Sequence, residues 1–189
     1  MAAFDFVLVL LSFVYALALA VVLQSAGRLI IERRRVKFSG LLALAMSNAV
    51  VTVFISWLGM WDYRDAKGMT LYDVTILFVS AVLIYLLCVA TAAEPDEAGE
   101  FDMDRFFWAQ FRFFYGAFTL LMVSYVAGTV IYLRTSQPQL FWQQALADIP
   151  AFLIGLAGFL SKNRRVQWAV GILVLIMSIW WAVAFSDTF

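Results

Sequence analysis

The chain has 189 residues, of which 65% are hydrophobic and 14% are charged, and its formal net charge is zero. A soluble domain has about a quarter of its residues charged, so this composition excludes an ordinary soluble protein. The zero net charge provides no overall field for nucleic acid, and we expect no nucleic-acid partner. The sequence has no histidine, and its single cysteine, Cys88, lies within an apolar run. We therefore expect no metal site and no cofactor.

Six apolar segments of about twenty residues follow one another, each long enough to cross a hydrocarbon core of about 30 Å as a helix. They cover residues 4–24, 40–60, 71–93, 112–133, 140–160 and 167–185. The first lacks the basic start of a signal peptide, so we interpret it as a true span. No gap between segments can hold a soluble domain. We predict one all-α transmembrane domain over residues 1–189, a polytopic bundle of six helices in three hairpins.

The stretch after the first span, GRLIIERRRVKFSG, holds five of the thirteen Lys and Arg residues. Two more lie at the start of the fourth span and three follow the fifth, so ten cations share one side of the predicted membrane. Because Lys and Arg mark the cytoplasmic side, both termini are predicted to lie outside. The same stretch supplies candidate contacts for anionic lipids, namely Arg33, Arg34, Arg35 and Lys37.

The second span has a polar face. Asn48, Thr52 and Ser56 are spaced i, i+4 and i+8, which places them on one side of a helix. Hydrogen bonding to neighbouring helices is the ordinary reason for such a face in a membrane. Lining a narrow aqueous path is the alternative, and the sequence alone leaves both open.

Two acidic features flank the third span. Thr70 and Asp73 have the spacing of a capping box, which predicts a structural role for Asp73 at the helix start. After the span, an acidic segment runs from Glu94 to Asp104, and Asp102 is expected to cap the next helix. The segment is either a solvated loop or an electrostatic clasp with the basic loops, within one chain or between subunits.

Arg112 stands at the edge of the fourth span, one helical turn after Trp108. One interpretation is that its side chain reaches back to the cytoplasmic interface, with a cation–π contact to Trp108. The other is a buried ion pair of Arg112 with Glu94 or Asp104. Such a pair would be a functional candidate, because charges inside a membrane are rare and costly.

The fifth span is unusual because its outer half contains Gln143, Gln144, Asp148 and Pro150. A continuous helix would place Gln144 and Asp148 on one face, which must contact other helices rather than lipid. A helix broken near Pro150 would instead make Asp148 the cap of a short helix, and interrupted spans are typical of transport sites. Gln143, Gln144 and Asp148, with the polar face of the second span, form the candidate transport site.

Three stretches, FDFVLVLLSFVYALALA, ERRRVKFSGLLALAMSNA and WLGMWDYR, resemble small six-span proteins of unknown function in proteobacterial inner membranes. The resemblance covers roughly the first third of the chain. It implies a location in the bacterial inner membrane. It implies no catalytic residue, because the shared residues serve topology and packing.

Three classes of function are compatible with these features. The first is a small oligomeric transporter or channel centred on Gln144 and Asp148. The second is a non-catalytic accessory or scaffold subunit of a membrane complex. The third is a lipid-acting membrane enzyme, which has least support because without histidine it would need the paired carboxylates of the acidic segment. The expected partners are membrane lipids, anionic at the cytoplasmic face, and either further copies of the chain or another membrane protein.

Overall fold

The computed structural model describes residues 3–60, 70–95, 99–136 and 138–186; for residues 3–6, 129, 131–147 and 184–186 it describes the backbone only. Six helices occupy the six apolar segments, which confirms the predicted all-α class. They are α1 (Ala3–Ile31), α2 (Gly40–Leu58), α3 (Leu71–Thr91), α4 (Met103–Ser136), α5 (Pro138–Leu160) and α6 (Arg164–Ser186). Apolar runs form helices in a membrane because a helix satisfies every backbone hydrogen bond within its own segment.

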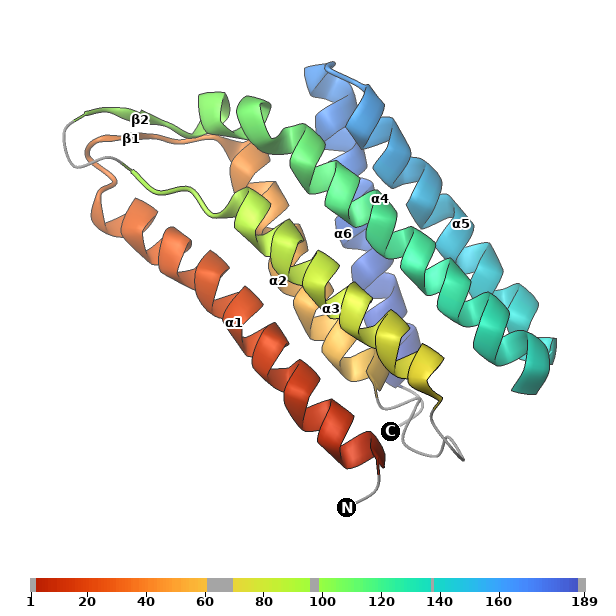
Figure 1. The fold of residues 1–189 in the computed structure, drawn as a ribbon. Helices are drawn as coiled ribbons and strands as arrows, with labels where there is room; N and C mark the ends of the chain where they lie inside the picture. The colour runs from red at the N-terminus through yellow and green to blue at the C-terminus, as the bar shows by residue number, and fades with distance from the viewer. Residues whose placement is uncertain (1–2, 61–69, 96–98, 137, 187–189) are drawn as a thin grey trace.

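Successive helices run in opposite directions, and α1 begins at the same end of the bundle at which α6 ends (Figure 1). The opposite end carries the connections α1–α2, α3–α4 and α5–α6, and we refer to it as the clasp end. Five helical stretches in the described part of the chain are long and apolar enough to cross a membrane: Val7–Ile31, Gly40–Leu58, Leu71–Thr91, Met103–Gly128 and Arg164–Val183. In α5 the corresponding apolar stretch is shorter, Asp148–Leu160.

Two helices begin with the caps that their sequences predict. At α3, the backbone N–H of Thr70 donates to Oδ2 of Asp73 at 2.8 Å, and the N–H of Asp73 donates to Oγ1 of Thr70 at 3.3 Å. At α4, Oδ1 of Asp102 accepts the backbone N–H groups of Asp104 and Arg105 at 2.9 and 3.1 Å. These contacts confirm the capping box and the capping role of Asp102.

Helix α5 is continuous through Pro150, so the broken-helix alternative is wrong. An interior proline removes one backbone hydrogen bond, but a membrane helix tolerates it where neighbouring groups satisfy the freed carbonyl. The C-terminal half of α5 packs closely on α4 through glycines. A Cβ added at Gly158 would lie 2.6 Å from Cδ1 of Tyr115, and one at Gly155 would lie 2.7 Å from Cδ1 of Phe118. Glycine therefore lets the two backbones approach, as small residues do between membrane helices.

The core lies along the middle of the bundle, where α3 and α4 pack together and α1 and α2 pack on α3. Small side chains are fully buried in this core, namely Ala18 on α1, Ala49 on α2 and Ala81 on α3. Helix α6 packs on α2 and α5. This arrangement brings the three connections of the clasp end close enough to interact.

Candidate functional site

Two short strands join the loops at the clasp end. Strand β1 (Val36–Lys37) pairs in parallel with β2 (Phe101–Asp102), with Val36 opposite Phe101. The backbone N–H of Phe101 donates to the carbonyl of Arg35 at 2.9 Å. The Nζ of Lys37 lies 2.8 Å from Oδ2 of Asp102. The strands lie side by side above α1 in Figure 1, so the α1–α2 loop is attached directly to the α3–α4 loop.

Each member of the Lys37–Asp102 pair favours the charged form of the other. The hydrogen bond from Lys37 lowers the pKa of the Asp102 carboxyl below its usual value, and the backbone N–H of Arg105 lowers it further. The hydrogen bond to Asp102 in turn raises the pKa of the Lys37 ammonium. Both groups are therefore charged throughout the neutral pH range.

Two further ion pairs extend this contact across the clasp end. Asp104 at the start of α4 accepts from Nη2 of Arg164 at 3.1 Å and from Oγ of Ser39 at 3.0 Å, which links it to the starts of α6 and α2. Nη1 of Arg28 on α1 lies 3.4 Å from Oε1 of Glu94. We call the pairs Lys37–Asp102, Arg164–Asp104 and Arg28–Glu94 the charge clasp. They confirm the predicted clasp in its form within one chain.

The charge clasp positions the loops more than it stabilises the fold. Side chains of Lys37 and Glu94 are 75% and 76% exposed, and exposed ion pairs contribute little free energy because water and salt screen them. A buried hydrogen bond supports the same region: Oγ of Ser25 donates to the carbonyl of Ala93 at 2.7 Å. The loop after α3 is thereby fixed against α1.

The predicted buried pair of Arg112 with Glu94 is wrong. Ser25 on α1 donates to the carbonyl of Ala93, which places the next residue, Glu94, beside α1. Glu94 therefore pairs with Arg28 instead. Arg112 is exposed on α4, with its guanidinium carbon 5.9 Å from the centre of the Phe111 ring. This exposed position fits the interpretation in which the side chain of Arg112 reaches an aqueous interface.

The four candidate lipid contacts lie on the turn and strand that follow α1. Arg33, Arg34 and Arg35 are exposed. Lys37 is also exposed, but its ammonium is bound to Asp102. Contact of these cations with anionic lipid stays a prediction.

The polar face of α2 makes hydrogen bonds to other helices. Nδ2 of Asn48 donates to the carbonyl of Gly171 on α6 at 2.9 Å. Ser56 shares a hydrogen bond of 2.6 Å with the hydroxyl of Tyr125 on α4 and also donates to the carbonyl of Thr52. Thr52 itself is buried. Asn48 and Ser56 therefore join α2 to two different helices, α6 and α4, and Thr52 lies buried between them in sequence.

Two buried side-chain oxygens stand out among the described residues because neither has a hydrogen-bond partner. They are Oδ1 of Asn48 and Oε1 of Gln167. An unpaired buried acceptor costs about 1–3 kcal/mol. The nitrogen of each amide nevertheless donates a hydrogen bond. The lack of a partner for the oxygen is therefore either a consequence of this packing or marks an acceptor for a small polar molecule such as water.

The candidate site on α5 is described only in part, and nothing tests it. Asp148 is partly buried and takes part in a hydrogen-bond or electrostatic interaction. The side chains of Gln143 and Gln144 lie outside the described residues. The transport role assigned to this face stays a prediction.

Gln167 is a structural residue that the sequence analysis missed. It is fully buried near the start of α6, and its Nε2 donates to the carbonyls of Gly158 at 2.8 Å and Ser161 at 2.6 Å. These carbonyls end α5, where backbone acceptors lack helical partners. Gln167 therefore fixes the turn that joins α5 to α6. The only signal in the sequence is a glutamine placed just inside an apolar segment.

Among the residues that the structure describes, no group of His, Cys, Asp and Glu side chains could hold a metal ion. No family model, no curated protein and no solved structure matches the chain.

Proposed function

We propose that the chain is a non-catalytic accessory or scaffold subunit of a membrane complex. The observation that carries this proposal is the use of the polar face of α2 for packing. Asn48 donates a hydrogen bond to the carbonyl of Gly171 on α6, and the hydroxyl of Ser56 shares one with the hydroxyl of Tyr125 on α4. A third interhelical bond, of 2.9 Å, joins Ser80 on α3 to Ser124 on α4. Polar groups used in this way hold helices together.

The charge clasp supports the same role. It joins three connections into one fixed surface at the end of the bundle, and most of its charged groups are exposed. A fixed, charged surface is suited to docking another protein, because complementary charge guides and orients association. The proposed partner is therefore another membrane protein.

The proposed location is the bacterial inner membrane, with six spans, both termini outside and the clasp end in the cytoplasm. The concentration of Lys and Arg at the clasp end supports this orientation. A tag placed after Phe189 should react with a membrane-impermeant reagent in intact spheroplasts. Reaction only after permeabilisation would contradict the orientation.

The accessory role is testable by photo-crosslinking in cells. A photoreactive residue is placed either at Glu100, which is exposed in the α3–α4 connection at the clasp end, or at Ile176 on α6, which is exposed and apolar. Because the partner is proposed to dock at the clasp end, the Glu100 position should give a single adduct with a second membrane protein, while the Ile176 position gives lipid adducts only. The absence of a protein adduct at the Glu100 position would contradict docking at the clasp end.

A small transporter or channel is the second candidate, and the unpaired oxygens of Asn48 and Gln167 favour it. In a channel, polar acceptors bind the permeating water or ions, a role that these two oxygens could take if water reached them. Purified protein in sealed liposomes distinguishes the two functions. The accessory role predicts no flux of protons, sodium or potassium above that of empty liposomes. Flux that Asp148→Asn abolishes would establish transport and overturn the accessory role.

A further inference from the structure

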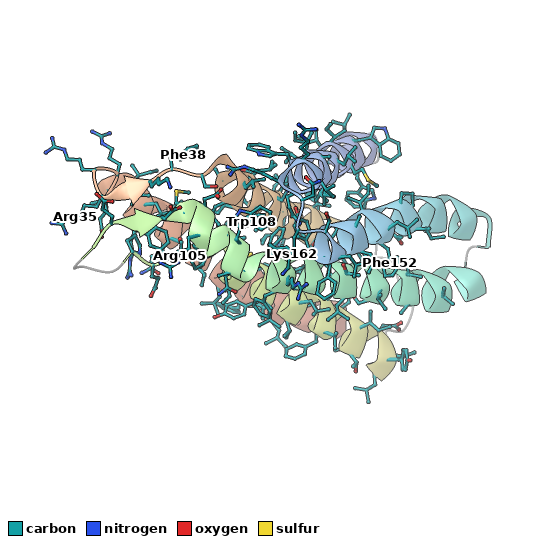
Figure 2. The ribbon with its side chains drawn as sticks, turned by 90° about the horizontal axis from the view of Figure 1, so that it is seen from above. Arg35, Phe38, Arg105, Trp108, Phe152 and Lys162 are labelled. Atoms are coloured by element: carbon teal, nitrogen blue, oxygen red, sulfur yellow. The ribbon has the colours of Figure 1, made fainter. Side chains whose placement is uncertain are left out.

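An open pocket of about 360 Å³ lies at the clasp end, away from the charge clasp itself. It is lined by Trp108, Ala109, Phe111 and Arg112 of α4 and by Lys162 of the α5–α6 turn. Figure 2, which views the bundle from above, shows Trp108 and Lys162 near each other, with Arg105 further along α4. Two cations and an indole from two separate segments thus line one hollow.

The two cations of this pocket differ from those of the charge clasp. Lys37 and Arg164 are bound to carboxylates, whereas neither Arg112 nor Lys162 makes an ion pair with any residue in the described part of the chain. The Arg112 guanidinium lies near the ring of Phe111, an arrangement that leaves its N–H groups able to donate. An unpaired guanidinium and ammonium around one hollow provide the donors and charge that a phosphate group requires.

The turn that carries Lys162 is held in place by its neighbours. Gln167 on α6 donates to the carbonyl of Gly158 near the end of α5 and to that of Ser161, the first residue of the turn. The side-chain oxygen of Asn163 accepts the backbone N–H of Arg165 at 2.9 Å, which caps α6. Because the turn is ordered before a ligand arrives, little conformational entropy is lost when one binds.

The surroundings of the pocket indicate the source of the phosphate. Phe113 on α4 and Phe159 and Leu160 on α5 are exposed apolar side chains that adjoin the pocket in sequence. Phe159 also lies beside Gly116, so the apolar surface bridges the two helices. Acyl chains would cover such a surface, and a tryptophan is typical of the level of lipid headgroups.

We infer that this pocket binds the phosphate headgroup of one anionic phospholipid, with its acyl chains along α4 and α5. Basic pockets between membrane helices on the cytoplasmic side are known to hold anionic headgroups. The inference holds whether the protein is an accessory subunit or a transporter, because it depends only on the pocket and its apolar border.

The test uses the double variant Arg112→Gln/Lys162→Gln and a matched control, Arg105→Gln/Arg165→Gln, whose residues do not line the pocket. The control removes the same charge from exposed residues at the same end of the bundle but outside the pocket. Each protein is released from nanodiscs of mixed phosphatidylglycerol and phosphatidylcholine, and native mass spectrometry counts the lipids that stay bound. Equal melting temperatures in a neutral detergent establish that the variants fold alike.

The wild type and the control should retain one phosphatidylglycerol per chain. The double variant should bind it about 30-fold more weakly, as expected for the loss of two basic contacts at a membrane surface. Equal retention by all three proteins, or equal loss in the control, would overturn the site. A parallel titration adds inorganic phosphate to the protein in neutral detergent. Stabilisation by free phosphate as large as that by phosphatidylglycerol would mean that the pocket takes a soluble anion, and would overturn the assignment to lipid.

Discussion

Replacing Gln167 with methionine tests how the α5–α6 turn is held. Methionine has a similar length and fills the same buried space, so the substitution removes the amide without leaving a large cavity. In the native structure Nε2 of Gln167 donates to Gly158 and Ser161 at 2.8 and 2.6 Å. Both carbonyls lose this donor in Gln167→Met.

The expected loss of stability follows from these two bonds. The buried carbonyl of Gly158 left without its donor costs about 1–3 kcal/mol, and the bond to the partly buried carbonyl of Ser161 contributes about 1 kcal/mol net, so the loss of both is worth about 2–4 kcal/mol. Methionine also removes the unpaired Oε1 of Gln167, which returns about 1 kcal/mol. We therefore expect Gln167→Met to lower the free energy of unfolding by about 1–3 kcal/mol.

Steric trapping in bicelles measures this free energy directly. The matched control is Gln110→Met on α4, because Gln110 is partly exposed and makes no hydrogen bond within the described part of the chain. The control should change stability by less than about 0.5 kcal/mol. If the two variants lose stability equally, Gln167 does not hold the turn.

Two more predictions concern the helix packing and the charge clasp. Gly158→Ala forces a Cβ to 2.6 Å from the Tyr115 ring, whereas Gly27→Ala meets nothing within 4 Å. Both substitutions gain the same helix propensity, so the difference between them reports the steric contact. The free energy of unfolding, measured by unfolding titrations, should be lower for Gly158→Ala than for Gly27→Ala by about 1–3 kcal/mol. Equal free energies of unfolding would refute the close packing. Lys37→Gln removes the hydrogen bond that lowers the pKa of Asp102. The stability that this bond contributes is present above the ordinary aspartate pKa of about 3.9, and it is lost as the pH falls through the lowered pKa. The melting temperature of Lys37→Gln should therefore lie below that of the wild type at neutral pH and low salt. This difference in melting temperature should disappear in acid and at high salt. A difference that depends on neither pH nor salt would contradict the electrostatic contact.

The helices and their caps could be predicted because they depend on local sequence. Apolar runs of sufficient length predict helices, and the capping box of Thr70 and Asp73 follows from spacing alone. The clasp could also be predicted as a feature, since opposite charges gather on one side of the chain. Its pairing could not be predicted: Arg164 and Asp104 are 60 residues apart, and only the antiparallel order of the helices brings them together.

Other features depend on backbone positions that the sequence does not reveal. The acceptors of Gln167 are main-chain carbonyls, which carry no residue-specific signal. The pairing of Glu94 with Arg28 rather than Arg112 follows from the bond of Ser25 to the carbonyl of Ala93, a contact between α1 and the loop after α3. The pocket of Arg112 and Lys162 likewise exists only because α5 packs back on α4 through its glycines.

The central claim is that the polar face of α2 packs against other helices and is not an aqueous path. Cysteine accessibility in sealed proteoliposomes tests it, with Thr52→Cys and Ser56→Cys each made in a Cys88→Ser background. Gly99→Cys on the exposed loop after α3 provides the positive control. A small charged thiol reagent should label Gly99→Cys readily and leave the two α2 variants unlabelled. Labelling of Thr52→Cys at the rate of Gly99→Cys would show water along α2 and contradict the account.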